Sequence, residues 1–334
     1  MTFHDLIRKN KRDSALLVVL MVALGVGIGA IIGGVVLPVG MGMAESAADE
    51  GPVSLSENLV IFLPSLFLGA AVALVVGAGG ALWSYFQGAN AILRMVHAQE
   101  ITPELDRELF NVVDEMRIAA GLPMPKVYLI PESALNAFAT GRNPANGVVA
   151  ITTGLRAKLT RDELQGVIAH EMAHIRHFDI RFSLLMATMV GLIVMACDIF
   201  LRMTIYSSMG RGHRRDSKGG GGAMIVLVVV AILLSVIAPI LARIIQMAYS
   251  RQREYLADAG AVELTRNPEG LASALRKLSH DEEPLVDMAN RGTAHMFIMN
   301  PLRKMRKSHQ NVRSRFCSHP PVEERIARLM ALAR

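Results

Sequence analysis

The residues best suited to catalysis in this chain are two histidines and a glutamate in the segment His170-Glu-Met-Ala-His174. Residues four apart on an α-helix lie on one face, so both imidazoles can bind the same divalent cation. Glu171 lies beside them, where its carboxylate can accept a proton from water. This H-E-x-x-H spacing predicts metal-assisted hydrolysis and requires a third protein ligand, with one coordination position left for water.

A helix is predicted around this motif because Thr160 and Glu163 form a capping-box pattern at its start. The motif alone arises by chance in roughly one chain per hundred of this length. The alternative is a helix whose solvent-exposed face carries two histidines four residues apart by chance. The strong cap and the neighbouring charges favour the metal site. His177 and Asp179 extend the polar face, and we expect His177 on the surface rather than on the metal.

The third metal ligand is expected in a second helix, which follows the last apolar stretch of the chain. Glu254 and Asp258 are four residues apart and therefore share a face of that helix. Position alone favours Glu254 without deciding the matter. The other acidic candidates for this ligand are Asp258, Glu263, Glu269 and Asp281.

A small β-sheet is predicted just before the helix that carries the H-E-x-x-H motif. The expected strands are 126–130, 136–141 and 147–154, preceded by an amphipathic helix over 103–121. Further helices are expected over about 269–279 and from Val322 onward. An edge of the sheet can bind a substrate backbone as an added strand, although a purely structural meander explains it equally well.

Four apolar stretches predict a membrane protein, since 52% of the 334 residues are hydrophobic and the mean hydropathy is +0.36. Residues 15–42 and 59–86 carry no charge and exceed the roughly 20 residues needed to cross a bilayer. The stretches 183–206 and 223–249 contain charges and are weaker. We expect these two to cross as well, as a hairpin joined by the Gly-rich basic linker 207–222. The alternative is that they only dip into the bilayer.

The distribution of charge predicts the orientation in the membrane. Arg8, Lys9, Lys11 and Arg12 precede the first span, whereas residues 43–58 contain acidic residues and neither Lys nor Arg. The positive-inside rule therefore places the N-terminus and the H-E-x-x-H segment in the cytoplasm. Two crossings by the hairpin would put its basic linker outside, against the same rule.

The predicted organisation combines these features into two membrane parts and one catalytic domain made of two segments. In order, it is a cytoplasmic N-terminus 1–14, span 15–42, extracytoplasmic loop 43–58, span 59–86, first catalytic part 87–182, apolar hairpin 183–249 and second catalytic part 250–334.

Two compositional features exclude other classes of protein. The net charge of +6 comes largely from basic residues near the C-terminus, at positions 303–315, without interleaved aromatics. On a membrane protein such a cluster favours anionic lipid over nucleic acid. The two cysteines, Cys197 in an apolar stretch and Cys317 in the basic region, do not predict a structural disulfide.

Taken together, the chain resembles the HtpX-type membrane zinc metallopeptidases of the M48 family over essentially its whole length. The resemblance depends on two N-terminal spans, an apolar hairpin and four motifs. These motifs are Asn136-Ala-Phe-Ala-Thr-Gly141, His170-Glu-Met-Ala-His174, Ser250-Arg-Gln-Arg-Glu-Tyr-Leu-Ala-Asp258 and Ser318-His-Pro-Pro321.

The resemblance implies a mostly helical α+β membrane protein with about four transmembrane helices. It further implies a small sheet beside a zincin-type (gluzincin) cytoplasmic catalytic domain. It implies one Zn²⁺ per subunit, with Glu254 as the third ligand beside His170 and His174. Asp258 would support a zinc-bound histidine from behind. His319 would lie near the developing oxyanion, and Asn136 would line the substrate cleft.

The predicted function is an integral-membrane zinc endopeptidase of the bacterial inner membrane. It would cleave misfolded or damaged membrane proteins at the cytoplasmic face under stress, with Glu171 as the general base and His319 as the stabiliser. One rival is an intramembrane protease, but charges such as Arg161 and Arg176 flank the motif, and Asn267-Pro-Glu-Gly270 only weakly matches its expected partner segment. The other rival is a non-catalytic membrane scaffold, which the intact Glu171 argues against.

Overall fold

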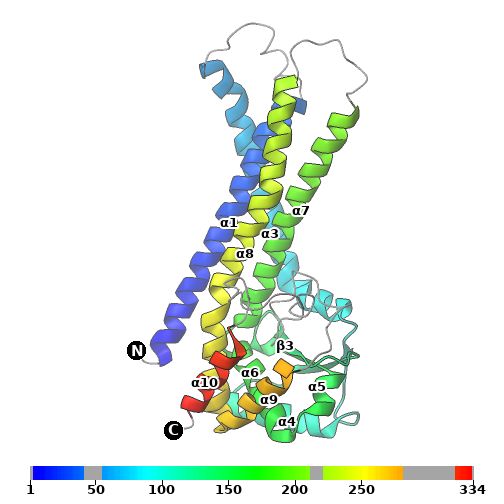
Figure 1. Cartoon of the computed structure of the whole chain (residues 1–334), viewed down its shortest axis with the longest axis vertical. Coiled ribbons are helices and arrows are strands. Elements are labelled where there is room, and N and C mark those ends of the chain that lie inside the picture. The colour runs from blue at the N-terminus through cyan, green and yellow to red at the C-terminus, as the bar shows by residue number, and fades with distance from the viewer. Residues whose placement is uncertain (1–2, 41–54, 211–220, 281–319, 333–334) are drawn as a thin grey trace. The chain divides into compact units, whose positions relative to one another are not determined.

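The computed structural model describes residues 3–40, 55–210, 221–280 and 320–332, and it divides the chain into two compact units. Unit 1 consists of Met1–Ala15, Trp83–Ala187 and Gln246–Arg334, and unit 2 of Leu16–Leu82 and Thr188–Ile245. The long helices are α1 (Phe3–Gly40), α3 (Leu55–Met95), α7 (Asp179–Gly210) and α8 (Gly221–Thr265), labelled in Figure 1. Each of them contributes residues to both units.

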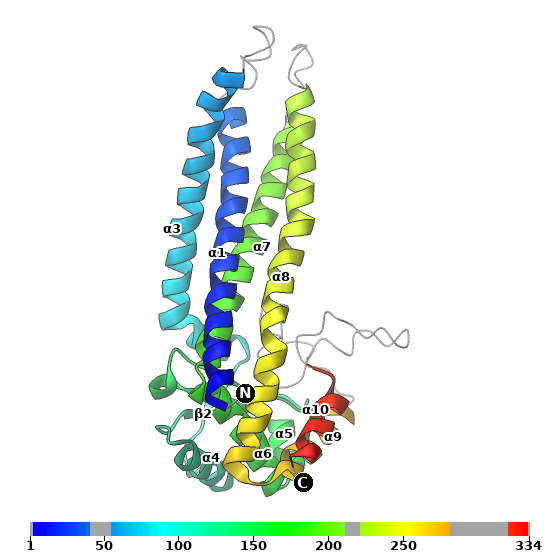
Figure 2. The same cartoon turned by 90° about the vertical axis from the view of Figure 1, so that its left-hand side faces the viewer.

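Unit 2 is built from the apolar parts of these four helices, which run alongside one another in Figure 2. Within the described residues, four helices are long and apolar enough to cross a membrane, which confirms the predicted number. The candidate spans are Ala15–Val36, Phe62–Met95, Asp179–Tyr206 and Val228–Ile245. Large apolar side chains such as Val75 and Phe67 are about 70% exposed on these helices. Such exposed apolar surface is typical of helices that face lipid.

Helices α1 and α3 approach each other closely in unit 2 because glycines line their contact. A Cβ atom on Gly69 of α3 would lie only 2.2 Å from the carbonyl oxygen of Gly29 on α1. One on Gly33 would lie 2.6 Å from the Cα atom of Gly69. Small residues at such positions let two helix backbones pack directly against each other, which is a common way for membrane helices to associate.

Unit 1 contains a four-stranded mixed sheet in the order β1-β2-β4-β3. The strands are β1 (Gln99–Glu100), β2 (Lys126–Ile130), β3 (Ala137–Thr140) and β4 (Val148–Thr152). Strands β2 and β4 are parallel, and the other two pairs are antiparallel. The sequence predicted three of these strands. It missed β1, which has two residues and is too short to show an alternating pattern.

Both faces of the sheet are covered, because alternate side chains along each strand point to opposite sides. On one face Val127, Val149 and Ile151 join the main core with helices α4 (Arg107–Ala120) and α6 (Arg161–Arg176). On the other face Phe138 and Ala150 pack with the end of α3 and the start of α7. The sheet therefore forms the centre of unit 1, with α6 on its main-core face.

Helix α6 begins as predicted. The Thr160 hydroxyl accepts a hydrogen bond from the Glu163 backbone N–H, and the Glu163 carboxylate accepts one from the Thr160 N–H. Helix α4 begins at Arg107, later than the expected start at Pro103. The reason is Asp106, whose side chain caps α4 by accepting from the Leu109 N–H. The remaining helices of unit 1 are α5 (Thr153–Lys158), the 3-10 turn η1 (Pro144–Asn146), α9 (Pro268–His280) and α10 (Val322–Ala331).

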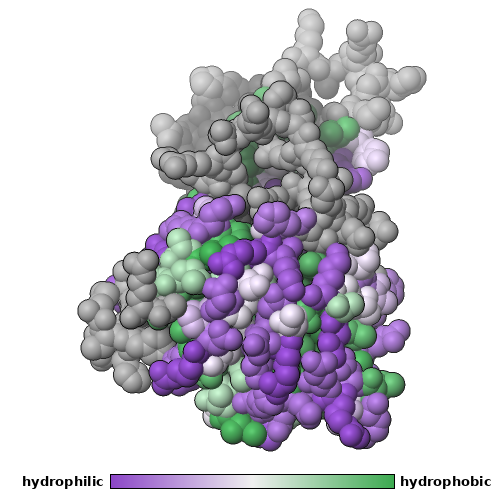
Figure 3. Space-filling view, turned by 60° about the horizontal axis from the view of Figure 1, so that its bottom comes forward, coloured by the Kyte–Doolittle hydropathy of each residue, from purple (hydrophilic) through white to green (hydrophobic). Residues whose placement is uncertain are grey.

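The face of unit 1 seen in Figure 3 is mainly hydrophilic, with apolar side chains scattered among charged ones. Leu105 and Ile118, in the segment around α4, are among the exposed apolar residues of unit 1. Helix α6 lies outside all four candidate spans. The placement of the H-E-x-x-H motif therefore speaks against an intramembrane protease, in which that motif would lie within a span.

Candidate metal centre

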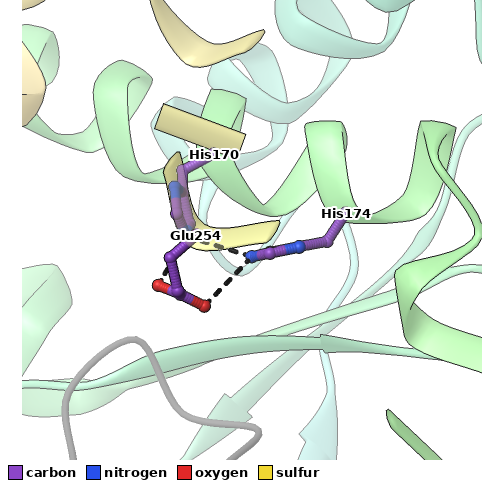
Figure 4. Close-up of side chains that lie close together, drawn as sticks. All are labelled: His170, His174 and Glu254. Carbon is purple, nitrogen blue, oxygen red and sulfur yellow. Dashed lines mark hydrogen bonds and ion pairs between the residues drawn. The ribbon is translucent and has the colours of Figure 1, made fainter. Parts of the chain in front are cut away.

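His170 and His174 on α6 converge with Glu254 on α8, as Figure 4 shows. The two Nε2 atoms are 3.1 Å apart. The Glu254 carboxylate lies across from them, with Oε2 at 3.8 Å from the His170 Nε2 and Oε1 at 3.7 Å from the His174 Nε2. Among the described residues, these three form the group of His, Cys, Asp or Glu side chains able to hold a metal ion.

The spacing of these atoms fits a zinc ion. Zinc binds nitrogen and oxygen at about 2.0–2.2 Å, so the ligand atoms of a tetrahedral site stand roughly 3.3 Å apart. The observed separations of 3.1 to 3.8 Å bracket this value. Two imidazoles and one carboxylate are also the donor set of catalytic zinc sites in which a fourth position stays open.

The outer nitrogen of each histidine contacts its own aspartate. The His170 Nδ1 lies 3.0 Å from Asp258 Oδ1, and the His174 Nδ1 lies 3.0 Å from Asp179 Oδ2. Because a carboxylate accepts hydrogen bonds, the His174 Nδ1 carries the proton and its Nε2 presents a lone pair. The position of Asp258 favours the same tautomer of His170. Two lone pairs facing each other at 3.1 Å repel unless a cation lies between them. The pair is therefore arranged to bind a proton or a metal.

Each of the two aspartates is held in turn by a buried arginine. The guanidinium of Arg325 on α10 donates to both oxygens of Asp258, through Nε at 2.9 Å and Nη2 at 2.7 Å. Its Nη1 also lies 3.2 Å from Glu254 Oε2. The guanidinium of Arg253 on α8 donates to Asp179. The centre is thus supported by two His–Asp–Arg chains of contacts.

The charges around the centre act on the two histidines in opposite directions. At His170, burial is the main cause and lowers the pKa. At His174, burial also opposes the charged form, but the carboxylates of Asp179 and Glu254 outweigh it and raise the pKa. In the protein without metal, a proton shared by the pair is therefore favoured on His174, and metal binding must displace it.

Glu171 is buried beside the centre, with 2% of its surface exposed. Burial, aided by the negative charge of Glu254, raises the pKa of Glu171 to about 7, although the charge of His174 and the nearby backbone N–H of Ala139 act in the opposite direction. Ala139 belongs to β3, an edge strand of the sheet. A carboxyl group that titrates near neutral pH can both accept and return a proton there.

The other candidate residues predicted from the sequence lie outside the group of three side chains. Glu263 and Glu269 lie on the surface, where they pair with Arg176 and Arg276 respectively. Asn136 is buried at the start of β3, and its Oδ1 accepts a hydrogen bond from the Ala137 N–H. The remaining candidates, Asp281 and His319, lie outside the described residues, as do Cys317 and the basic positions 303–315.

The expectation that His177 lies on the surface is wrong. His177 is 9% exposed, and one of its ring carbons lies near Gly260 of α8. Because residue 260 is a glycine without a side chain, α8 can pass close to the end of α6. This close approach covers the His177 ring. His177 does not belong to the group of three side chains able to hold a metal.

Sequence reasoning missed Arg325, Arg253 and the role of Asp179. A signal for Arg325 was present, because it lies on the same face of its helix as Val322 and Leu329, which are buried. A charged residue within an apolar stripe indicates a buried ionic partner. No comparable local signal marks the contact between Asp179 and Arg253, since 74 positions separate them.

Known proteins resemble this chain over most of its length. Residues 103–333 match the Peptidase family M48. A "Protease HtpX homolog" of Thermodesulfovibrio yellowstonii is 45% identical over 286 residues, covering 83% of this chain and 96% of that protein. Its namesake in Streptococcus equi subsp. equi is 41% identical over 263 residues, covering 78% and 86%. The crystal structure of S. mikatae Ste24p aligns with a TM-score of 0.44 at 20% identity, covering 91% of this chain and 66% of that one.

Proposed function

Because the chain belongs to peptidase family M48, and is thus a membrane-associated metalloprotease, we propose that its ion is zinc and that His170, His174 and Glu254 bind it. Glu171 is then the general base of an endopeptidase. One observation carries the proposal: two imidazole nitrogens and a carboxylate from two different helices meet at separations suited to one zinc ion.

The chemistry divides between the ion and the protein. Zinc held by His170, His174 and Glu254 would supply Lewis acidity, which would make water a stronger acid and polarise the carbonyl group of a peptide. Glu171 accepts the proton from the attacking water and then delivers it to the leaving amine, so no net proton is gained or lost. The raised pKa of Glu171 suits both transfers. We assign stabilisation of the oxyanion to His319, following the S-H-P-P motif of the family.

Substrate binding is proposed along the edge of β3. This strand ends the sheet, and the Ala139 backbone N–H lies close to the carboxylate of the general base Glu171. An extended peptide that added to this edge would bring its scissile bond next to that carboxylate. Asn136 directly precedes the strand and is proposed to line the same cleft.

The proposed location is the cytoplasmic face of a bacterial inner membrane. Its support is the four candidate spans together with the basic segment before the first of them. Unfolded or misassembled membrane proteins suit an enzyme in which the helix that carries Glu254, α8, also contains a candidate span. We therefore propose membrane-protein quality control under stress as its biological role, with the lipid bilayer as its other partner.

The experiment that tests the proposal compares wild type with Glu171→Gln and Glu254→Ala, each purified in detergent. Zinc content is measured alongside cleavage of an unfolded membrane protein. We expect Glu171→Gln to keep one zinc per chain and to lose cleavage by at least about 10²-fold. Glu254→Ala should lose zinc. Substantial cleavage by Glu171→Gln would refute the role of the base, whereas a zinc-loaded wild type without proteolytic activity would support the scaffold.

A further inference from the structure

Arg253 is an unusual residue to find beside a metal ligand. It directly precedes Glu254 on α8, and only 6% of its surface is exposed. Its guanidinium donates to Asp179, which is 3% exposed, and stacks at 4.8 Å from the ring of Phe182. Two neighbouring residues on α8 thus serve one centre in different ways: Glu254 faces the histidines, and Arg253 reaches the aspartate behind His174.

Stability alone is a poor reason to bury such a pair. Removing two charges from water costs free energy that their attraction often fails to recover, and an apolar pair of similar volume commonly serves the fold as well. The arrangement of the pair suggests another reason. Asp179 is the first residue of α7 and Arg253 lies on α8 beyond the candidate span Val228–Ile245, so the pair joins the two helices outside that span. His174, which Asp179 also contacts, lies on α6.

The backbone before Asp179 supports the same interpretation. Phe178 has a φ of +62°, a left-handed conformation that bulky side chains rarely adopt. This residue lies in the junction between α6 and α7, and the Oδ2 of the Asp179 that follows it lies 3.0 Å from the Nδ1 of His174. Unfavourable backbone conformations persist where the surroundings require them, and they gather at functional sites.

We propose that Asp179 and Arg253 are positioning residues of the metal centre: the pair fixes the imidazole of His174 and ties it to the helix that carries Glu254. This inference rests on the proposed zinc site and adds two residues to it that never touch the ion. Asp179 holds the Nδ1 proton, so that Nε2 faces the centre. Arg253 fixes the aspartate and leaves it one orientation.

Substitution of Arg253 distinguishes a positioning role from a purely electrostatic effect on zinc affinity. Removing a cation near a site for a dication would, by electrostatics alone, raise the affinity of that site for zinc. Loss of positioning acts in the opposite direction, and removal of such outer contacts typically weakens metal affinity 10- to 100-fold. The sign of the change therefore separates the two explanations.

The test measures zinc affinity of the full-length protein in detergent, by competition with a chelating dye, for wild type, Asp179→Asn, Arg253→Met and Arg253→Lys. We expect a decrease of about 10- to 100-fold for Asp179→Asn and Arg253→Met, with partial recovery in Arg253→Lys. The matched control is Arg176→Met. Its ion pair with Glu263 likewise involves α8, but it joins that helix to α6 on the surface, at 3.4 Å. This control should bind zinc like wild type.

Cobalt substitution gives a second measurement, which a merely structural role would not change. The visible absorption of bound Co²⁺ reports the geometry of its ligands, so Arg253→Met should alter that spectrum and Arg176→Met should not. Unchanged or increased zinc affinity in Arg253→Met would overturn the inference. If His174→Ala keeps wild-type zinc affinity, the proposed site itself is wrong, and the two failures are thereby distinguished.

Discussion

Arg325 offers the sharpest test of how the domain is held together. Its side chain is 0% exposed and contacts two carboxylates, with two hydrogen bonds to Asp258 and a third contact to Glu254. Replacing it with methionine keeps most of the volume and removes the charge. Both carboxylates then remain buried without their cation, and breaking a buried pair in this way costs about 3–5 kcal/mol.

The expected effect on thermal unfolding follows from that figure. For a unit of this size, each kcal/mol shifts the midpoint by about 2–4 °C, so Arg325→Met should lower it by about 6–20 °C. The assay is thermal unfolding of the metal-free protein in detergent, which separates this effect from zinc binding. The control is Arg276→Met, whose side chain is 44% exposed and pairs with Glu269 on the surface.

An exposed ion pair contributes between zero and about 1 kcal/mol, so the control should shift the midpoint by a few degrees at most. Equal shifts in Arg325→Met and Arg276→Met would refute the reasoning, because they would mean that the buried contacts carry no more free energy than a surface pair. A double variant, Arg325→Met with Asp258→Asn, should recover part of the loss, since one uncompensated charge is then removed.

Three further outcomes are expected. Gly69→Leu should lower the midpoint of thermal unfolding, because its Cβ atom would lie 2.2 Å from the Gly29 carbonyl oxygen, whereas Gly77→Leu, with nothing within 4 Å, should not. At Glu163, burial would raise the pKa of the carboxyl group, but hydrogen bonds from α9 and Thr160 outweigh burial and lower that pKa. The charged carboxylate therefore stabilises the fold fully above the ordinary pKa of 4.5, and this stabilisation is lost as the pH falls. We expect Glu163→Gln to unfold at a lower temperature than wild type at pH 7, and its midpoint to fall less than that of wild type on acidification. Chelation of zinc should lower the midpoint of wild type and leave that of Glu254→Ala unchanged, because only a protein that binds the ion gains from it.

Local patterns allowed much of the fold to be predicted. The capping box at Thr160, the alternation along β2 and β4 and the length of the apolar stretches each act over a few residues, and each marks an element found in the structure. The third metal ligand could also be predicted, because the segment around Glu254 resembles a motif of a known family. Its position on α8 opposite His170 and His174 agrees with that expectation.

The supporting pair of Asp179 and Arg253 could not be predicted in the same way. The contact between Asp179 and Arg253 depends on how two helices far apart in sequence meet, and nothing in either local segment specifies it. The burial of His177 was also not predictable from local sequence. Its polar neighbours favoured the surface, yet the close passage of α8 at Gly260 covers it. Burial of a single side chain is decided by tertiary packing, which local sequence does not reveal.

The central claim is that His170, His174 and Glu254 hold one zinc ion. A crystal structure of the zinc-loaded protein, with anomalous diffraction measured at the zinc edge, tests it most directly. We expect one anomalous peak per chain, about 2.0–2.2 Å from the two Nε2 atoms and from a Glu254 oxygen. A peak elsewhere, or one with Glu254 outside bonding distance, would contradict the claim.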